Sequence, residues 1–357
     1  MTDRTLLLHR HLPELLELEL ILRRGEGRLR VEHLLDVQLP GAAPDMPALP
    51  VHGIVLGSER DDAPAVGFFG GVHGVERIGA QIVLSFLRTT VERLRWDSLF
   101  REQLAQVRLV FMPMVNPGGI WLRTRANPRG VDLMRNAPVD ATGDRRGRVP
   151  FLVGGHRHGP WLPWYRGRRG DPMEPEAQAL VSFARRELLR APLSLSIDVH
   201  SGFGARDRLW FSYARSHRPI DHLAEVHALE LLFDRTHPYH HDYLVEPQSV
   251  NYTTHGDLWD FLYDEARENA PERIFLPFTL ELGSWLWVKK NPRQLLQFFG
   301  LFNPVLQHRL KRVLRQHTVL FDFFVRAAHC RADWLPAGSQ REEYRRAALR
   351  HWYGEDG

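Results

Sequence analysis

The stretch AVGFFGGVHGVERI, residues 65–78, is the most informative part of this sequence. It begins with apolar residues that predict a buried strand, and two glycines end that strand. His73 and Glu76 follow, three residues apart, at the entrance of a predicted helix. Residues at this spacing share one face of a helical turn, so both side chains can reach a single ion. The pair alone is weak evidence for a metal site, because a chain with 19 histidines contains on the order of one such pair by chance.

Two later segments place chemically active side chains at strand ends in the same way. In PLSLSIDVHSGFG, residues 192–204, an apolar strand ends with His200, and in PFTLELGSW, residues 277–285, a buried-looking strand contains one carboxylate, Glu281. A His, Glu, His set that leaves one position open is typical of catalytic zinc sites. A charge inside an apolar strand is costly without a partner, and a glutamate beside a metal can take a proton from water. A salt bridge to one of the many arginines is the alternative for Glu281.

A fourth segment, MVNPGGIWLRTRANPRGVDLMRNAP at residues 114–138, lies between the first two. Its Asn-Pro-Gly-Gly sequence, residues 116–119, predicts a turn after a strand. The arginines beyond this turn can hold a carboxylate by two parallel hydrogen bonds or stabilise an oxyanion. For Arg123 and Arg129 we favour a solvated surface position.

The remaining pattern predicts an α/β fold. Apolar residues recur at helical spacing in 78–87 and in 175–189, and these helices alternate with short apolar runs that predict strands. Such an alternation is typical of a mixed, mostly parallel sheet covered on both faces, an α/β/α sandwich. Residues 12–24 fit either a helix or a strand. The predicted strands are 29–39, 51–56, 65–69, 107–113, 193–199, 208–213 and 276–282.

We divide the chain into an N-terminal helix or strand extension (1–45), a catalytic domain (46–330) and a polar helical tail (331–357). Segment 137–172 is rich in Gly, Pro, Arg, His and Trp and has no period. Long connections of this kind are often functional, and its tryptophans suit the wall of a substrate pocket. Within the helical region after residue 300, the cations Arg309, Lys311 and Arg312 lie between the apolar positions, and we interpret them as a solvated helix face.

Composition argues against several classes of protein. The net charge is only +4 and no block of basic residues stands alone, so we expect no nucleic-acid partner. The single cysteine, Cys330, excludes an internal disulfide and a Cys-rich zinc site, and it fits a reducing compartment. Residues 1–10 lack the apolar core of a signal peptide, and no apolar run is long enough to span a membrane. We therefore expect a cytoplasmic protein without a membrane partner, and the sequence carries no signal for its oligomeric state.

In this order, the segments resemble the zinc carboxypeptidase family over roughly residues 50–300. The resemblance implies the three-layer fold of that family and one zinc ion per chain, held by His73, Glu76 and His200. It also implies that Glu281, in TLELG, is the catalytic base. The further roles that it implies are Arg125 polarising the scissile carbonyl, Asp132 orienting His73, Arg135 holding the terminal carboxylate of the substrate, and Asn136 and Tyr252 contacting the substrate.

One position departs from the family pattern. The family usually has an asparagine immediately before the carboxylate-binding arginine, where this chain has Met134. The preferred hypothesis remains a carboxypeptidase acting on small peptides. The departure favours an alternative with the same metal chemistry, a deacylase of N-acyl amino acids similar to aspartoacylase and succinylglutamate desuccinylase. A third hypothesis is a binding protein that keeps the fold without catalysis.

Several other polar side chains have two interpretations. Asp257 or Asp260 could select a basic side chain of the substrate, or could cap the helix that follows. His156 and His158 could assist at the rim of the pocket. By spacing, a second metal site could form in HPYHHD, but we favour surface or structural roles for all of these histidines, namely His156, His158, His237, His240 and His241.

Overall fold

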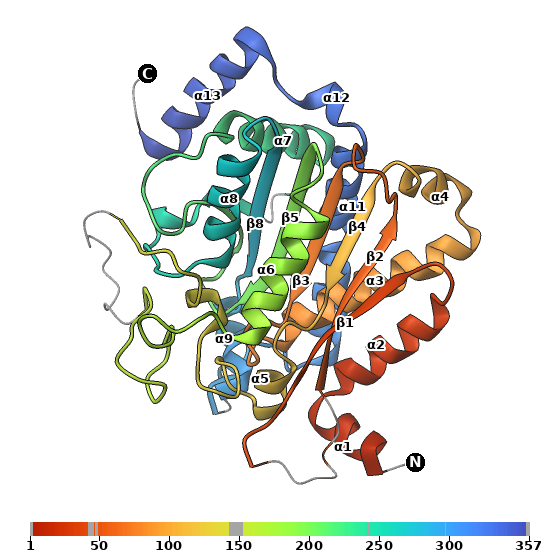
Figure 1. Ribbon diagram of the computed structural model, residues 1–357, viewed down its shortest axis with the longest axis vertical. Coiled ribbons are helices and arrows are strands. Elements are labelled where there is room, and N and C mark those ends of the chain that lie inside the picture. Colours follow the sequence, from red (N-terminus) through yellow and green to blue (C-terminus); the bar gives the residue numbers. More distant parts are fainter. Residues whose placement is uncertain are drawn as a thin grey trace.

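The computed structural model describes residues 3–41, 46, 49–142, 153–240, 243–296 and 298–354. Within these residues, eight strands form one sheet in the order β1-β2-β4-β3-β5-β8-β6-β7 (Figure 1). The strands are β1 (Arg30–Val37), β2 (Leu49–Gly57), β3 (Ala65–Gly70), β4 (Arg108–Met112), β5 (Leu193–Ser201), β6 (Asp207–Phe211), β7 (Tyr243–Pro247) and β8 (Ile274–Leu282).

The centre of the sheet is parallel and its flanks are partly antiparallel. β4, β3, β5 and β8 are parallel neighbours. The pairs β1–β2, β2–β4 and β6–β8 are antiparallel, and β6–β7 is parallel. Every residue of β3, β4 and β5 is buried, which explains why these strands are continuous apolar runs rather than alternating ones. The predicted mixed, mostly parallel sheet is therefore confirmed.

Helices cover both faces of the sheet, as the sequence predicts. α3 (Arg77–Trp96) and α11 (Thr318–His329) pack against β3 and β5 on one face, and α6 (Pro175–Glu187) and α8 (Leu258–Asn269) lie on the other (Figure 1). Between the sheet and the first helix pair, the rings of Phe68, Phe86, Phe111 and Phe321 form one aromatic cluster.

Both ends of the chain pack onto this central unit. Segment 12–24, which fits two structures by sequence, is a helix, α2 (Pro13–Arg24), that begins at its proline and ends at Gly25. It packs on α3, where Arg77 Nε donates to Glu14 Oε1 at 2.9 Å and both side chains are buried. The division into an extension, a catalytic domain and a tail stays a prediction. At the other end, α13 (Gly338–Tyr353) packs on α7 (Leu223–Thr236).

The predicted strands match the observed ones to within about two residues, but β7 was not predicted. It is a half-buried strand at the edge of the sheet, so it lacks the apolar run of the central strands.

In the part of the chain that the structure describes, no helix has the length and apolar character needed to cross a bilayer. The remaining helices are α1 (Asp3–His11), α4 (Ser98–Leu104), α5 (Pro117–Leu122), α9 (Trp285–Lys290), α10 (Gln307–Gln316) and α12 (Arg331–Trp334), with 3-10 turns η1 (Leu133–Arg135), η2 (Gln248–Val250), η3 (Pro292–Leu296) and η4 (Phe298–Leu301).

Candidate metal centre and active site

The candidate site lies at the carboxyl ends of three adjacent parallel strands. His73 and Glu76 occupy the connection from β3 to α3, His200 is the penultimate residue of β5, and Glu281 is the penultimate residue of β8. His200 and Glu281 are paired in register across β5 and β8. Open α/β sheets commonly bind ligands at this edge, because the connections that leave the strands can bring several side chains to one point.

Close backbone packing fixes the connection that carries the first two residues. A Cβ atom at Gly74 would lie 1.9 Å from the carbonyl carbon of Gly119, so only glycine fits between His73 and Glu76. Asn116, which is fully buried, accepts the N–H of Gly119 at 2.7 Å and donates to the carbonyl of Val72 at 3.1 Å. The predicted turn at 116–119 is thus the capped start of α5, and it holds the metal-site connection in place.

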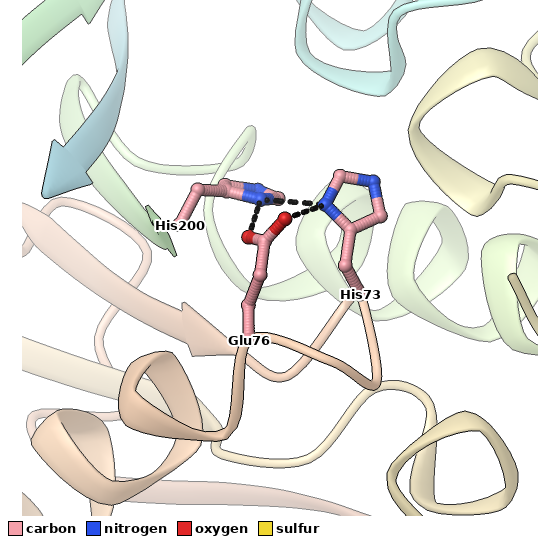
Figure 2. Close-up of side chains that lie close together, drawn as sticks. All are labelled: His73, Glu76 and His200. Carbon is pink, nitrogen blue, oxygen red and sulfur yellow. Dashed lines mark hydrogen bonds and ion pairs between the residues drawn. The ribbon is translucent and has the colours of Figure 1, made fainter. Parts of the chain in front are cut away.

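His73, Glu76 and His200 converge on one point (Figure 2). His73 Nδ1 is 2.9 Å from Glu76 Oε1, His200 Nδ1 is 3.0 Å from Glu76 Oε2, and the two Nδ1 atoms are 3.1 Å apart. Two ligand atoms bound to one zinc ion at a tetrahedral angle are about 3.3 Å apart. Two imidazoles and one carboxylate are also ligand types that zinc prefers. The three residues therefore fit a zinc ion, and within the described residues no other cluster of this kind occurs.

A second carboxylate lies behind each histidine. His73 Nε2 is 3.0 Å from Asp132 Oδ1, and His200 Nε2 is 2.9 Å from Asp198 Oδ2. A carboxylate that accepts the Nε2–H leaves the lone pair of Nδ1 free for a metal. Asp132 was predicted in this position, whereas Asp198 was missed. Its signal was present, because residues two apart in a strand share a face, so Asp198 had to lie on the same side of β5 as His200.

Neighbouring charges decide the ionisation of the site. Burial acts to raise the pKa of Glu76, but His73 and His200 outweigh it and hold that pKa below its usual range. Burial likewise acts to lower the pKa of His200, but Asp198 and then Glu76 outweigh it and raise the pKa well above its usual value. Binding of a cation must displace the proton from this imidazole, so metal affinity falls as the pH falls.

Arg125 donates hydrogen bonds to two carboxylates of the metal centre. Its Nε donates to Asp132 Oδ2 at 2.8 Å and its Nη1 donates to Glu76 Oε1 at 3.0 Å. Burial acts to raise the pKa of Asp132, but Arg125 and then His73 outweigh it and hold that pKa well below its usual range. Arg125 therefore lies beside the metal centre. It contacts the predicted ligand Glu76 and also Asp132, the carboxylate behind His73. Its predicted action on a substrate carbonyl stays a prediction.

Glu281 lies beside the triad without belonging to it. Its Oε1 accepts the backbone N–H of Phe203 at 3.0 Å, and no arginine of the described residues forms an ion pair with it, so the salt-bridge alternative is not found there. Burial, and then the charge of Glu76, raise the pKa of Glu281 to about 8. A carboxyl group with such a pKa can both take and release a proton near neutral pH.

These side chains open into one cavity of about 900 Å³. Arg135 is 4% exposed and lines it, and its Nε has no hydrogen-bond partner among the described residues. A buried guanidinium with a free N–H is suited to a carboxylate. Segment 160–164 forms part of the wall, as predicted for the loop 137–172, of which residues 143–152 lie outside the described residues. The cavity also takes in His73, Glu76, Arg125, Asp132, Met134, His200, Tyr252, Asp257 and Glu281.

Asn136, a predicted substrate contact, has hydrogen-bond partners in two neighbouring loops. Its Nδ2 donates to the carbonyl of Arg166 at 3.1 Å and its Oδ1 accepts the N–H of Glu174 at 2.6 Å. It is not among the residues that line the cavity. The side chain therefore links its own loop to those of Arg166 and Glu174, and its contact with a substrate stays a prediction.

The two aspartates with alternative interpretations differ in position. Asp257 caps α8 by accepting the N–H groups of Trp259 and Asp260, and it also lines the cavity, so its capping role is confirmed. Asp260 accepts the N–H groups of Ala214 and Arg215 and is not part of the cavity lining. Burial raises the pKa of Asp257.

The other histidines have structural contacts. His156 Nε2 is 2.7 Å from the carbonyl of Pro163, and its ring stacks on His158. His237 stacks on the ring of Phe233. His240 stacks on Tyr243. These contacts agree with the structural roles that we favour for these histidines. His241 lies outside the described residues.

Comparison with known proteins agrees with this geometry. Residues 47–286 match the family described as zinc carboxypeptidase. An 80-residue segment, 22% of this chain, is 34% identical to Carboxypeptidase SOL1 of Arabidopsis thaliana and covers 16% of that protein. Among solved structures, carboxypeptidase A from Helicoverpa armigera aligns with a TM-score of 0.62 at 16% identity, covering 88% of this chain and 72% of that one. Bovine thrombin-activatable fibrinolysis inhibitor aligns with a TM-score of 0.59 at 16% identity, covering 87% of this chain and 93% of that one.

The family match extends over more than half of the chain, so this protein belongs to the zinc carboxypeptidase family. The structural likenesses, at their low identities, show the shared α/β fold. The cofactor of the family is zinc, and the buried His73, Glu76 and His200 are the described residues that can hold it.

Proposed function

We propose that this protein is a zinc-dependent carboxypeptidase that removes C-terminal residues from small peptides. One observation carries the proposal: a buried arginine with an unpartnered N–H, Arg135, lines the same cavity as the zinc-binding triad and Glu281. A free α-carboxylate is the group that would satisfy such a guanidinium. A peptide held by its terminal carboxylate would present its last amide bond to the groups at the strand ends.

Glu281, Arg125 and Tyr252 have different roles in the proposed hydrolysis. A zinc ion, when bound, polarises the scissile carbonyl and makes a water molecule more acidic. Glu281, held by the N–H of Phe203, takes the proton of the attacking water and passes it to the leaving amine. Arg125 has Nε and Nη1 engaged by carboxylates, and its Nη2 has no bond to the described residues, so this nitrogen can donate to the developing oxyanion. Burial raises the pKa of Tyr252, which keeps its phenol a hydrogen-bond donor in the cavity.

The test compares peptides that differ only in the C-terminal group. We expect the zinc-loaded protein to cleave a peptide with a free C-terminus and to leave its C-terminal amide intact. Glu281→Gln should retain about one zinc per chain, by elemental analysis, and lose roughly 100-fold or more in kcat, because the base is absent. Arg135→Gln should raise KM for the free acid more than it lowers kcat. Equal cleavage of acid and amide, or full activity of Glu281→Gln, would contradict the proposal.

One observation favours a second candidate, a deacylase of N-acyl amino acids. Met134 is 3% exposed and lines the cavity at the position where the family usually has asparagine, so one polar contact to a peptide terminus is replaced by an apolar surface. A set of N-acyl amino acids assayed beside the peptides separates the two activities. If the deacylase is correct, N-acyl amino acids turn over faster than any peptide, and Met134→Asn shifts the ratio towards peptides.

A further inference from the structure

The segment after the catalytic strand is unusually basic. Residues 282–321 contain seven lysines and arginines and no aspartate or glutamate. Because the whole chain has a net charge of +4, the rest of the chain has a net charge of −3. The positive charge of this protein is thus concentrated in the region formed by α9, η3, η4 and α10, directly after β8.

Six of the seven cations of this region are exposed, and these six form no ion pair with a described residue. On α10, Lys311, Arg312 and Arg315 lie at spacings of one, three and four residues and form one exposed helix face with His308. None of the exposed cations of the region forms an ion pair with a described residue, whereas some surface arginines elsewhere do, for example Arg185 with Glu265. The basic surface is defined by the six exposed cations Lys289, Lys290, Arg293, Lys311, Arg312 and Arg315.

Hydrogen bonds join α9 and α10, which carry five of the six exposed cations. Arg309 Nη1 donates to the carbonyl of Trp287 at 3.1 Å, and its Nη2 reaches the carbonyl of Lys290 at 3.5 Å, so the start of α10 is fastened to the end of α9. Trp285 at the start of α9 and Phe302 after η4 both line the catalytic cavity. The region that carries the basic surface therefore also supplies part of the cavity wall.

Large apolar side chains project from the same region. Leu296 is 86% exposed, Trp285 is 55% exposed and Val305 is 45% exposed, and Leu286 and Leu306 are each 36% exposed. Exposed apolar side chains among unpaired cations are typical of proteins that lie on a bilayer, where the apolar groups enter the headgroup layer and Lys and Arg neutralise lipid phosphates. A purely acidic polypeptide such as polyglutamate would pair with the cations but would leave these apolar groups in water.

We propose that the basic surface binds an anionic phospholipid bilayer from one side, without any segment crossing it. Docking in this orientation brings Trp285, which also lines the catalytic cavity, to the lipid headgroups. The proposal replaces two expectations from the sequence: that the cations of α10 form a plain solvated face, and that the protein has no membrane partner. It does not depend on which amide the active site hydrolyses.

Co-sedimentation of the zinc-loaded full chain with vesicles tests the proposal. We expect binding to phosphatidylcholine vesicles that contain phosphatidylglycerol, weaker binding as salt is added, and little binding to phosphatidylcholine alone. Lys311→Gln with Arg315→Gln should lower the partition coefficient about 30-fold, because each cation near the surface contributes about a factor of five. Leu296→Ser should lower it roughly tenfold through loss of apolar insertion.

A matched control lies on α13, where Arg346 and Arg350 are exposed at the same spacing of four residues. Arg346→Gln with Arg350→Gln removes the same charge, and it should leave vesicle binding unchanged. An equal loss in both double variants would overturn the proposal, since binding would then follow net charge alone. It would also be overturned by absence of binding to phosphatidylglycerol vesicles, or by binding to polyglutamate without binding to vesicles, which would identify an acidic polypeptide as the occupant.

Discussion

The histidines of the metal centre share one arrangement: Nδ1 faces the other ligands and Nε2 faces a carboxylate. For His73 the carboxylate is Asp132, and for His200 it is Asp198, which also accepts the indole N–H of Trp259 at 3.0 Å. Such partners orient the ring and increase its basicity as a ligand. We therefore expect zinc binding to depend on both carboxylates as well as on the three ligands.

Asp198→Asn tests this dependence at a residue that does not touch the metal position. We expect zinc affinity to fall about 10- to 100-fold, because the amide cannot stabilise the same orientation and charge of the imidazole. Competition with a chromogenic chelator measures the zinc Kd, with Asp234→Asn on the exposed face of α7 as the control. Unchanged zinc affinity with an unchanged fold would show that Asp198 is only a packing partner of Trp259.

At the scale of an element, a buried histidine lies immediately before α7, and its ionisation affects the free energy of unfolding. His222 precedes the helix, and its Nδ1 is 3.1 Å from the phenol oxygen of Tyr263. Burial, with the charges of Arg267 and Arg341, lowers the pKa of His222 from its usual 6.5 to about 4. A neutral imidazole is thus part of the folded state at this position.

The lowered pKa predicts a loss of stability in acid. The unfolded chain binds a proton at this histidine below about pH 6.5 and the folded chain only below about pH 4, so the free energy of unfolding decreases as the pH falls between these values. The contribution of His222 reaches about 3 kcal/mol. Urea unfolding at a series of pH values should show a shallower acid dependence for His222→Gln than for the wild type. Parallel pH profiles would contradict the prediction.

The packing of α13 on α7 also includes a charged contact. Arg341 Nε donates to Glu225 Oε1 at 2.6 Å, and the side chain of Glu225 is only 3% exposed. Arg341→Ala should lower the free energy of unfolding by about 1–3 kcal/mol, because it leaves a buried carboxylate without its partner. Urea denaturation measures the change, with Arg346→Ala on the same helix as the control. If the contact is responsible, Glu225→Gln in the Arg341→Ala background recovers part of the loss.

At the scale of the whole molecule, the metal centre joins segments that are far apart in the chain. Its ligands come from the connection after β3 and from the end of β5, and α3 starts directly after Glu76. Zinc that binds the folded chain and not the unfolded one stabilises the fold by about 4 kcal/mol at a thousandfold excess over its Kd. A chelator should therefore lower the Tm of the wild type and leave the Tm of His73→Ala unchanged. An equal response of both proteins would place the stabilising metal elsewhere.

The sequence by itself determined the features that local geometry controls. His73 and Glu76 share a face because three residues separate them in a turn, and His200 and Glu281 lie at the site edge because each is the penultimate residue of an apolar strand. The α/β/α class followed from the alternation of apolar runs and helical patterns. The edge strand β7 was not predicted, because a half-buried strand has only a weak apolar pattern in the sequence.

Only the tertiary structure decided which distant side chains meet. It brought Trp259 to the carboxylate behind His200, joined Asn136 to the loops of Arg166 and Glu174, and placed Arg135 in the lining of the cavity. It also joined α9 and α10 through Arg309 and left their exposed cations without acidic partners among the described residues. Spacing within one element is set by the geometry of the backbone, whereas contacts between elements depend on how the layers pack and on which backbone groups remain to be satisfied.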